Sequence, residues 1–122
     1  MAGVSSYKDL IVWQKAVTFV TDTYKTTGRF PASEQFGLTS QLRRAAVSVP
    51  SNIAEGYGRR SNGDFVRFLQ IAMGSLFEVQ TQLEIAHNLN FLPSAMYDTV
   101  LMQSVEIEKM LASLIQKVKA QK

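Results

Sequence analysis

Five arginines are the side chains of this sequence whose chemistry and spacing suggest a binding role. Arg43 and Arg44 precede a stretch of small and polar residues, Arg59 and Arg60 follow it, and Arg67 comes shortly afterwards. A guanidinium carries several N–H donors in a fixed plane, which match the oxygens of a phosphate group. The five arginines are therefore candidates for contacts with the phosphates of RNA or DNA.

The same arginines have a second interpretation, as a solvated surface without a ligand. Glu55, Asp64 and Glu78 supply opposite charge nearby, and the chain carries a net charge of only +3. A mildly basic chain permits nucleic acid as a partner but does not require it. Both interpretations stay open on composition.

The sequence does not support a catalytic site or a metal site. There is no cysteine and only one histidine, His87, which has no evident catalytic partner. Glu84 and His87 match a Glu-x-x-His motif once, whereas a di-metal site in a helix bundle needs a second copy from another helix. Serine and threonine nucleophiles need a base that activates them. We expect no enzyme activity, no cofactor and no metal.

Length and composition predict one domain that spans residues 1–122. Hydrophobic residues make up 46% and charged residues 19%, a balance typical of a folded globular protein. No run approaches the ~20 apolar residues of a membrane-spanning helix, and no basic segment followed by an apolar run begins the chain. We therefore expect a cytoplasmic protein with no membrane partner.

The first predicted helix covers about residues 7–27. Ser6 can cap its start, with Asp9 three residues later, and Gly28 followed by Pro31 ends it. An apolar stripe with alternating spacings of three and four predicts the face that packs on the core: Leu10, Trp13, Val17, Val20 and Tyr24.

The second predicted helix, about residues 38–57, contains Pro50 in its interior. A proline there removes one hydrogen bond and crowds the carbonyl of Ala46, which costs roughly 3 kcal/mol. We predict a kink at Pro50, where Ser48 and Ser51 can donate to the carbonyls left free. The surrounding small residues favour close approach of a neighbouring helix.

Two longer helices complete the prediction, over about residues 62–89 and 94–119. The third carries an apolar stripe over six turns: Phe65, Leu69, Ala72, Leu76, Val79, Leu83 and Ala86. Gly74 and Ser75 suggest a close helix crossing, and we expect the basic end of the fourth helix to fray. No segment alternates with the period of a strand. The sequence therefore predicts an all-α, up-down-up-down four-helix bundle with a kinked second helix.

The chain resembles a known family in three stretches. These are YKDLIVWQKA (7–16), GLTSQLRRAAVSVPSNIAEGYGRRS (37–61) and FVRFLQIAMGSLFEVQTQLEIA (65–86). All three are similar to the four-helix-bundle proteins of the 23S rRNA intervening-sequence family, also called S23 ribosomal protein-like. The accessory variability determinant of diversity-generating retroelements looks like a relative.

The resemblance implies a homopentamer, a ring with a central channel and no enzymatic role. Some family members are encoded within insertions in 23S rRNA genes. The retroelement relatives bind nucleic acid and a reverse transcriptase through a basic surface, so RNA, DNA and a reverse transcriptase or other protein are the implied partners.

A ring is compatible with the apolar residues outside the predicted core stripes. A cyclic oligomer joins two different patches of each copy, head to tail. We expect four flanking residues to contribute to that contact: Ile11, Phe19, Phe68 and Phe77. The predicted function is a non-catalytic, ribonucleoprotein-associated nucleic-acid-binding ring, and the alternative is a protein-interaction scaffold without a nucleic-acid role.

Overall fold

The computed structural model describes residues 3–121 as helices joined by short links. The four long helices are α1 (Ile11–Thr27), α2 (Leu38–Tyr57), α3 (Asn62–Asn88) and α4 (Ser94–Ala120). Two short 3-10 turns, η1 (Tyr7–Asp9) and η2 (Ala32–Glu34), precede α1 and α2. The described part of the chain contains no strand, so the all-α prediction is confirmed.

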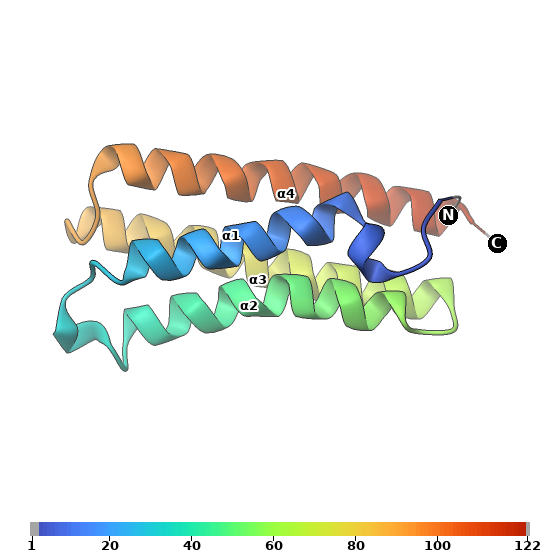
Figure 1. The fold of residues 1–122 in the computed structure, drawn as a ribbon, viewed down its shortest axis with the longest axis horizontal. Helices are drawn as coiled ribbons and strands as arrows, with labels where there is room; N and C mark the ends of the chain where they lie inside the picture. The colour runs from blue at the N-terminus through green and yellow to red at the C-terminus, as the bar shows by residue number, and fades with distance from the viewer. Residues whose placement is uncertain (1–2, 122) are drawn as a thin grey trace.

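The four helices lie side by side as an elongated bundle (Figure 1). The α1–α2 and α3–α4 links lie at one end, whereas α1 begins, α4 ends and α2 turns into α3 at the other. Successive helices therefore run in opposite directions. Each helix packs against two others, in the cyclic order α1, α2, α3 and α4.

The predicted start of the first helix is a separate turn in the structure. Ser6 and Asp9 form the expected reciprocal cap, but on η1, and Leu10 then takes an extended conformation before α1 begins. The backbone N–H and the hydroxyl of Ser5 both donate to the Asp9 carboxylate at 2.9 Å. These bonds stabilise the carboxylate and hold the pKa of Asp9 below its usual range.

The core-facing side of α1 agrees with the predicted stripe only in part, since Leu10 is buried and Trp13 and Val20 pack against the core. Val17 and Tyr24, from the predicted stripe, are 37% and 44% exposed, whereas Ala16, Phe19 and Thr23 are fully buried. Thr23 can face the core because its hydroxyl donates to the carbonyl of Phe19 at 2.8 Å. The helix thus has two apolar sides, and the bundle core uses the one that contains threonines.

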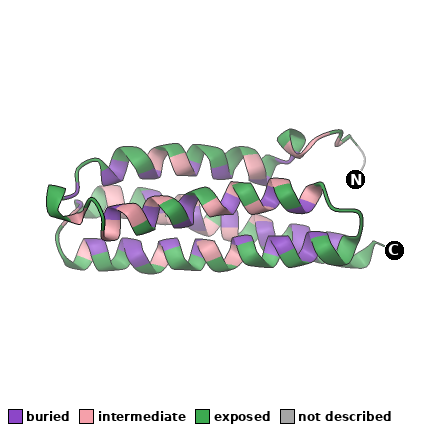
Figure 2. Ribbon diagram, turned by 90° about the horizontal axis from the view of Figure 1, so that it is seen from below, coloured by how far each residue is buried: buried purple, intermediate pink, exposed green. Residues whose placement is uncertain are grey.

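The predicted core stripe of α3 is confirmed, since all seven of its residues are buried. Along each helix in Figure 2, buried positions alternate with exposed ones, and the buried positions gather towards the bundle interior. The core joins residues of all four helices. One continuous core of this kind holds the helix ends, and the links between them, in fixed places.

Helix α2 continues through Pro50 to Tyr57. The Ser48 hydroxyl forms a hydrogen bond with the Ser75 hydroxyl of α3 at 2.8 Å, and the Asn52 amide donates to the Ser48 carbonyl. Ser48 therefore joins α2 to α3 instead of bonding the carbonyl that Pro50 leaves free. The kink itself stays a prediction.

Gly56 sets the approach of α2 to α3 near their link. A Cβ atom at this position would lie 2.6 Å from the Cβ of Phe68. At Gly74, by contrast, an added Cβ meets nothing within 4 Å, so the predicted close crossing does not involve Gly74 within the chain.

Replacing Gly56 with alanine should lower the free energy of unfolding by about 1–3 kcal/mol. The Cβ of Phe68 is bonded to the α3 backbone, so rotation of the side chain cannot relieve the clash. Gly74→Ala is the matched control and should raise stability by up to about 1 kcal/mol through helix propensity. Urea denaturation of both variants measures the difference. Equal stabilities would contradict the proposed role of Gly56.

Candidate nucleic-acid interface

The short link between α2 and α3 brings two of the predicted arginines together. The Ser61 hydroxyl accepts from the backbone N–H of Asp64 at 3.1 Å and starts α3 directly after the turn. The guanidinium carbons of Arg59 and Arg67 then lie 4.7 and 4.8 Å from the centroid of the same Phe68 ring. Arg59 and Arg67 therefore meet across the link, over one aromatic ring.

Nearby carboxylates only weakly neutralise these two arginines. Glu55 lies 3.9 Å from Arg59 and Asp64 lies 3.9 Å from Arg67, with all four side chains about half exposed. Exposed ion pairs contribute roughly 0–1 kcal/mol, so they compete poorly with a polyanion. In the described part of the chain, no carboxylate oxygen lies within 4.0 Å of the exposed Arg60.

The end of α4 adds positive charge that the sequence prediction missed. Helix α4 continues to Ala120, and the Asn62 amide donates to the carbonyl of Gln121 at 3.2 Å. Lys119 and Asn62 line the same shallow hollow beside the α2–α3 link. The basic end, defined as Arg59, Arg60, Arg67 and Lys119, therefore draws on the α2–α3 link, α3 and α4.

Arg43 and Arg44 lie near the other end of α2 and do not belong to the basic end. The Arg43 Nε donates to the Thr27 hydroxyl at 2.8 Å and one terminal nitrogen donates to the Tyr24 carbonyl at 3.2 Å. Its guanidinium also lies 4.5 Å from the centroid of the Tyr24 ring. Arg43 thus ties α2 to the end of α1, while Arg44 is exposed.

The four predicted contact residues of an oligomer divide into two pairs. Ile11 and Phe77 are 54% and 46% exposed, so both are available to a neighbouring copy. Phe19 is fully buried in the core, and Phe68 is 7% exposed beneath its two arginines. The prediction is therefore wrong for Phe19 and Phe68, because their own chain already covers them.

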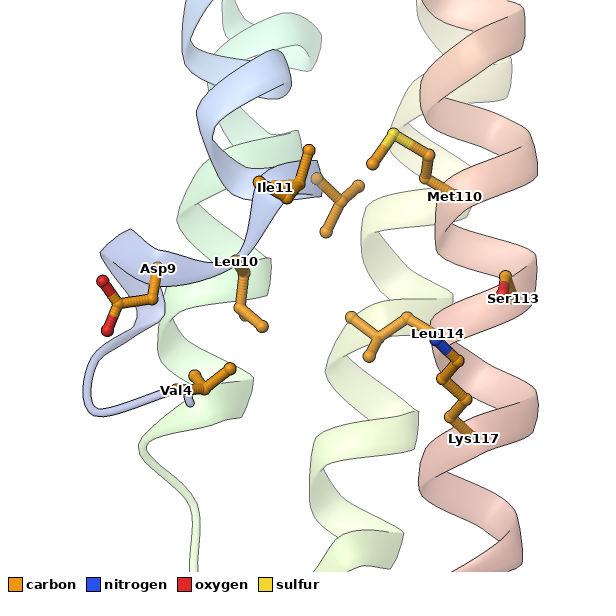
Figure 3. A pocket seen from close by; sticks show the side chains of 9 residues that line it. Val4, Asp9, Leu10, Ile11, Met110, Ser113, Leu114 and Lys117 are labelled. Carbon is orange, nitrogen blue, oxygen red and sulfur yellow. The ribbon is translucent and has the colours of Figure 1, made fainter. Parts of the chain in front are cut away.

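An apolar hollow lies between the start of α1 and the second half of α4 (Figure 3). It measures about 540 Å³, and Leu10, Ile11 and Leu114 form part of its wall. Asp9, the acidic residue at its rim, turns its carboxylate away from α4 towards Ser5 and Ser6. The polar side chains around this hollow do not converge on one point, as those of a catalytic site would.

The formal Glu-x-x-His motif is not arranged as a metal site. The His87 ring stacks on Tyr97 at 4.3 Å and its Nε2 lies 3.1 Å from the Ser94 hydroxyl, at the start of α4. Within residues 3–121, no three His, Asp or Glu side chains gather in a group that could hold a metal ion. His87 here supports the α3–α4 link.

Comparison with known proteins extends the resemblance seen in the sequence. A solved structure of a protein of unknown function, from the S23 ribosomal protein family of Bacteroides thetaiotaomicron, is 27% identical. The match covers 86% of this chain and 98% of that one, with a TM-score of 0.78. No curated protein matches the chain.

No helix in the described range is long and apolar enough to cross a membrane.

The family model described as 23S rRNA-intervening sequence protein matches residues 8–113. This range contains the stretches 37–61 and 65–86 in full and all of the stretch 7–16 except Tyr7. The chain belongs to the 23S rRNA-intervening sequence protein family.

Proposed function

We propose that this chain is a non-catalytic, cytoplasmic protein that assembles as a homopentamer and binds RNA or DNA, as part of a ribonucleoprotein. The observation that carries the nucleic-acid part is the pair formed by Arg59 and Arg67 over Phe68, with Arg60 beside it. Phosphates would meet guanidiniums that are already gathered at one end of the bundle.

The electrostatics of the basic end support a polyanion as the ligand. Its cations come from the α2–α3 link, α3 and α4, and the two carboxylates paired with them are about half exposed and lie 3.9 Å away. Phosphate contacts of this kind carry no direct sequence readout. The ligand would therefore be selected mainly by charge and shape, and binding would weaken steeply as salt rises.

Assembly would multiply this charge. Five copies carry five times the +3 of one chain. Exposed apolar residues on α3 favour an assembly, since Ile71, Phe77 and Ile85 are each more than 40% exposed on the bundle surface. A contact between copies would remove these side chains from water, at about 25 cal/mol per Å² of apolar area.

Two measurements test the proposal. Light scattering at micromolar concentration should give a mass near five times 13.6 kDa, and a mass near 13.6 kDa would contradict assembly. Titration with structured RNA and duplex DNA at two salt concentrations should reveal binding that weakens as salt rises. Absence of binding to either at low salt would leave the protein-interaction scaffold as the remaining function.

A further inference from the structure

A second hollow lies where α1 ends and α2 begins, at the opposite end of the bundle from the basic end. It measures about 510 Å³ and combines two aromatic rings, two arginines and small polar side chains. The residues that matter are Tyr24, Phe36, Arg43 and Arg44. Among the described residues that line it, the charged side chains are the two arginines, while the nearby Glu34 carboxylate accepts from the backbone N–H of Leu38 at 3.0 Å.

Phe36 is the most exposed large apolar side chain in the described range, at 91%. The same link buries its other phenylalanine, Phe30, which is 7% exposed. The centroid of its ring lies 5.6 Å from that of the Phe91 ring. The link can therefore bury an aromatic ring in the core, yet it places Phe36 in water. A free ring at the edge of a hollow is suited to stacking on another flat ring.

The arginines of the hollow differ in how they are held. Arg43 is fixed by its bonds to Thr27 and to the Tyr24 carbonyl, and its guanidinium lies over the Tyr24 ring. Arg44 is exposed and, among residues 3–121, forms no ion pair. The hollow thus has one fixed and one adjustable positive group within reach of the same ligand.

We propose that this hollow binds an unpaired nucleotide of a nucleic acid, with its base on Phe36 and its phosphate at Arg44 and Arg43. This inference rests on the proposed nucleic-acid function and adds to it a preference for single-stranded segments. An aromatic platform beside positive groups is how proteins hold single strands without reading their sequence. A base inside a duplex offers no free face, because its neighbours already stack on it.

The test compares a short unpaired oligonucleotide with the duplex of the same sequence, using fluorescence anisotropy at low salt. Phe36→Ala should weaken binding of the unpaired strand about 5- to 150-fold, the range expected for loss of one base stack. It should leave duplex binding at the basic end unchanged. Phe36→Trp should retain the affinity, and Phe36→Leu should behave as the alanine variant does.

Met102→Ala is the matched control, because Met102 is also strongly exposed, at 72%, but lies on α4. An equal effect of Phe36→Ala and Met102→Ala, or equal losses for strand and duplex, would overturn the inference. A change in the mass measured by light scattering on Phe36→Ala would also overturn it, since Phe36 would then contact a second copy. Failure of the wild-type chain to bind either nucleic acid would instead reject the proposed function itself.

Discussion

Replacing Arg59, Arg60 and Arg67 with glutamine should greatly weaken binding of RNA and DNA and flatten its dependence on salt. Each lost phosphate contact removes about one from the slope of log affinity against log salt. The triple variant should therefore lower the size of this slope by about three for each protomer that touches the ligand. The counterion contribution to binding disappears near 1 M salt. A slope lower by three therefore means an affinity roughly 1000-fold weaker at 0.1 M salt.

A second triple variant controls for net charge. Lys15, Lys25 and Lys109 are exposed on α1 and α4 and do not belong to the basic end. Their replacement by glutamine removes the same charge and should change the salt slope much less. Equal slopes for the two triple variants would show that overall charge, not the basic end, attracts the ligand.

Phe19→Ala should destabilise the chain by about 3–5 kcal/mol, the loss expected when a fully buried phenylalanine leaves a cavity. Phe77→Ala removes the same ring from a side chain that is 46% exposed, so it should change the stability of one protomer by no more than about 0.5 kcal/mol. Urea denaturation measures both values.

When assembly is measured, Phe77→Ala should have the larger effect and Phe19→Ala the smaller one. Phe77→Ala should shift the mass found by light scattering towards the monomer at low protein concentration, because a half-exposed ring is available to a neighbour. Phe19→Ala should keep the assembled mass under conditions where it stays folded. If Phe19→Ala dissociates the oligomer and Phe77→Ala does not, Phe77 is not a contact residue.

The boundaries of the last three helices could be predicted because their signals are local. Ser61 with Asp64 marks the start of α3, and Pro93 marks the position before α4. Predicted bounds of 38–57, 62–89 and 94–119 agree with the structure to within one residue. The Ser61 cap acts on the nearest backbone N–H group, and a proline restricts the backbone beside it, so neither signal needs tertiary contacts.

The core face of α1 could be predicted only in part from its periodicity, which placed Leu10, Trp13 and Val20 correctly. A stripe shows which residues share a side of the helix, but not which side meets the core. In α1 the core side contains Thr23, Thr26 and Thr27. Because threonine is polar, residue type alone would place all three at the surface. The hydroxyls of Thr23 and Thr27 donate to carbonyls one turn back, which removes the penalty for their burial.

The candidate site shows the same division between local and tertiary information. A short link predicts that Arg59 and Arg67 meet, because few conformations can separate them. The contribution of Lys119 depends on where α4 ends relative to Asn62, which no local pattern encodes. The burial of Phe68 likewise depends on two arginine side chains that extend over its ring.

The shared ring beneath Arg59 and Arg67 also affects the entropy of ligand capture. A long arginine side chain usually loses rotamer freedom when it binds, at about 0.5–1.5 kcal/mol for each side chain immobilised. Contact with the Phe68 ring restricts both side chains before any ligand arrives. Part of that loss is thus incurred during folding, and under the proposed function the basic end would meet a phosphate backbone with its donors pre-organised.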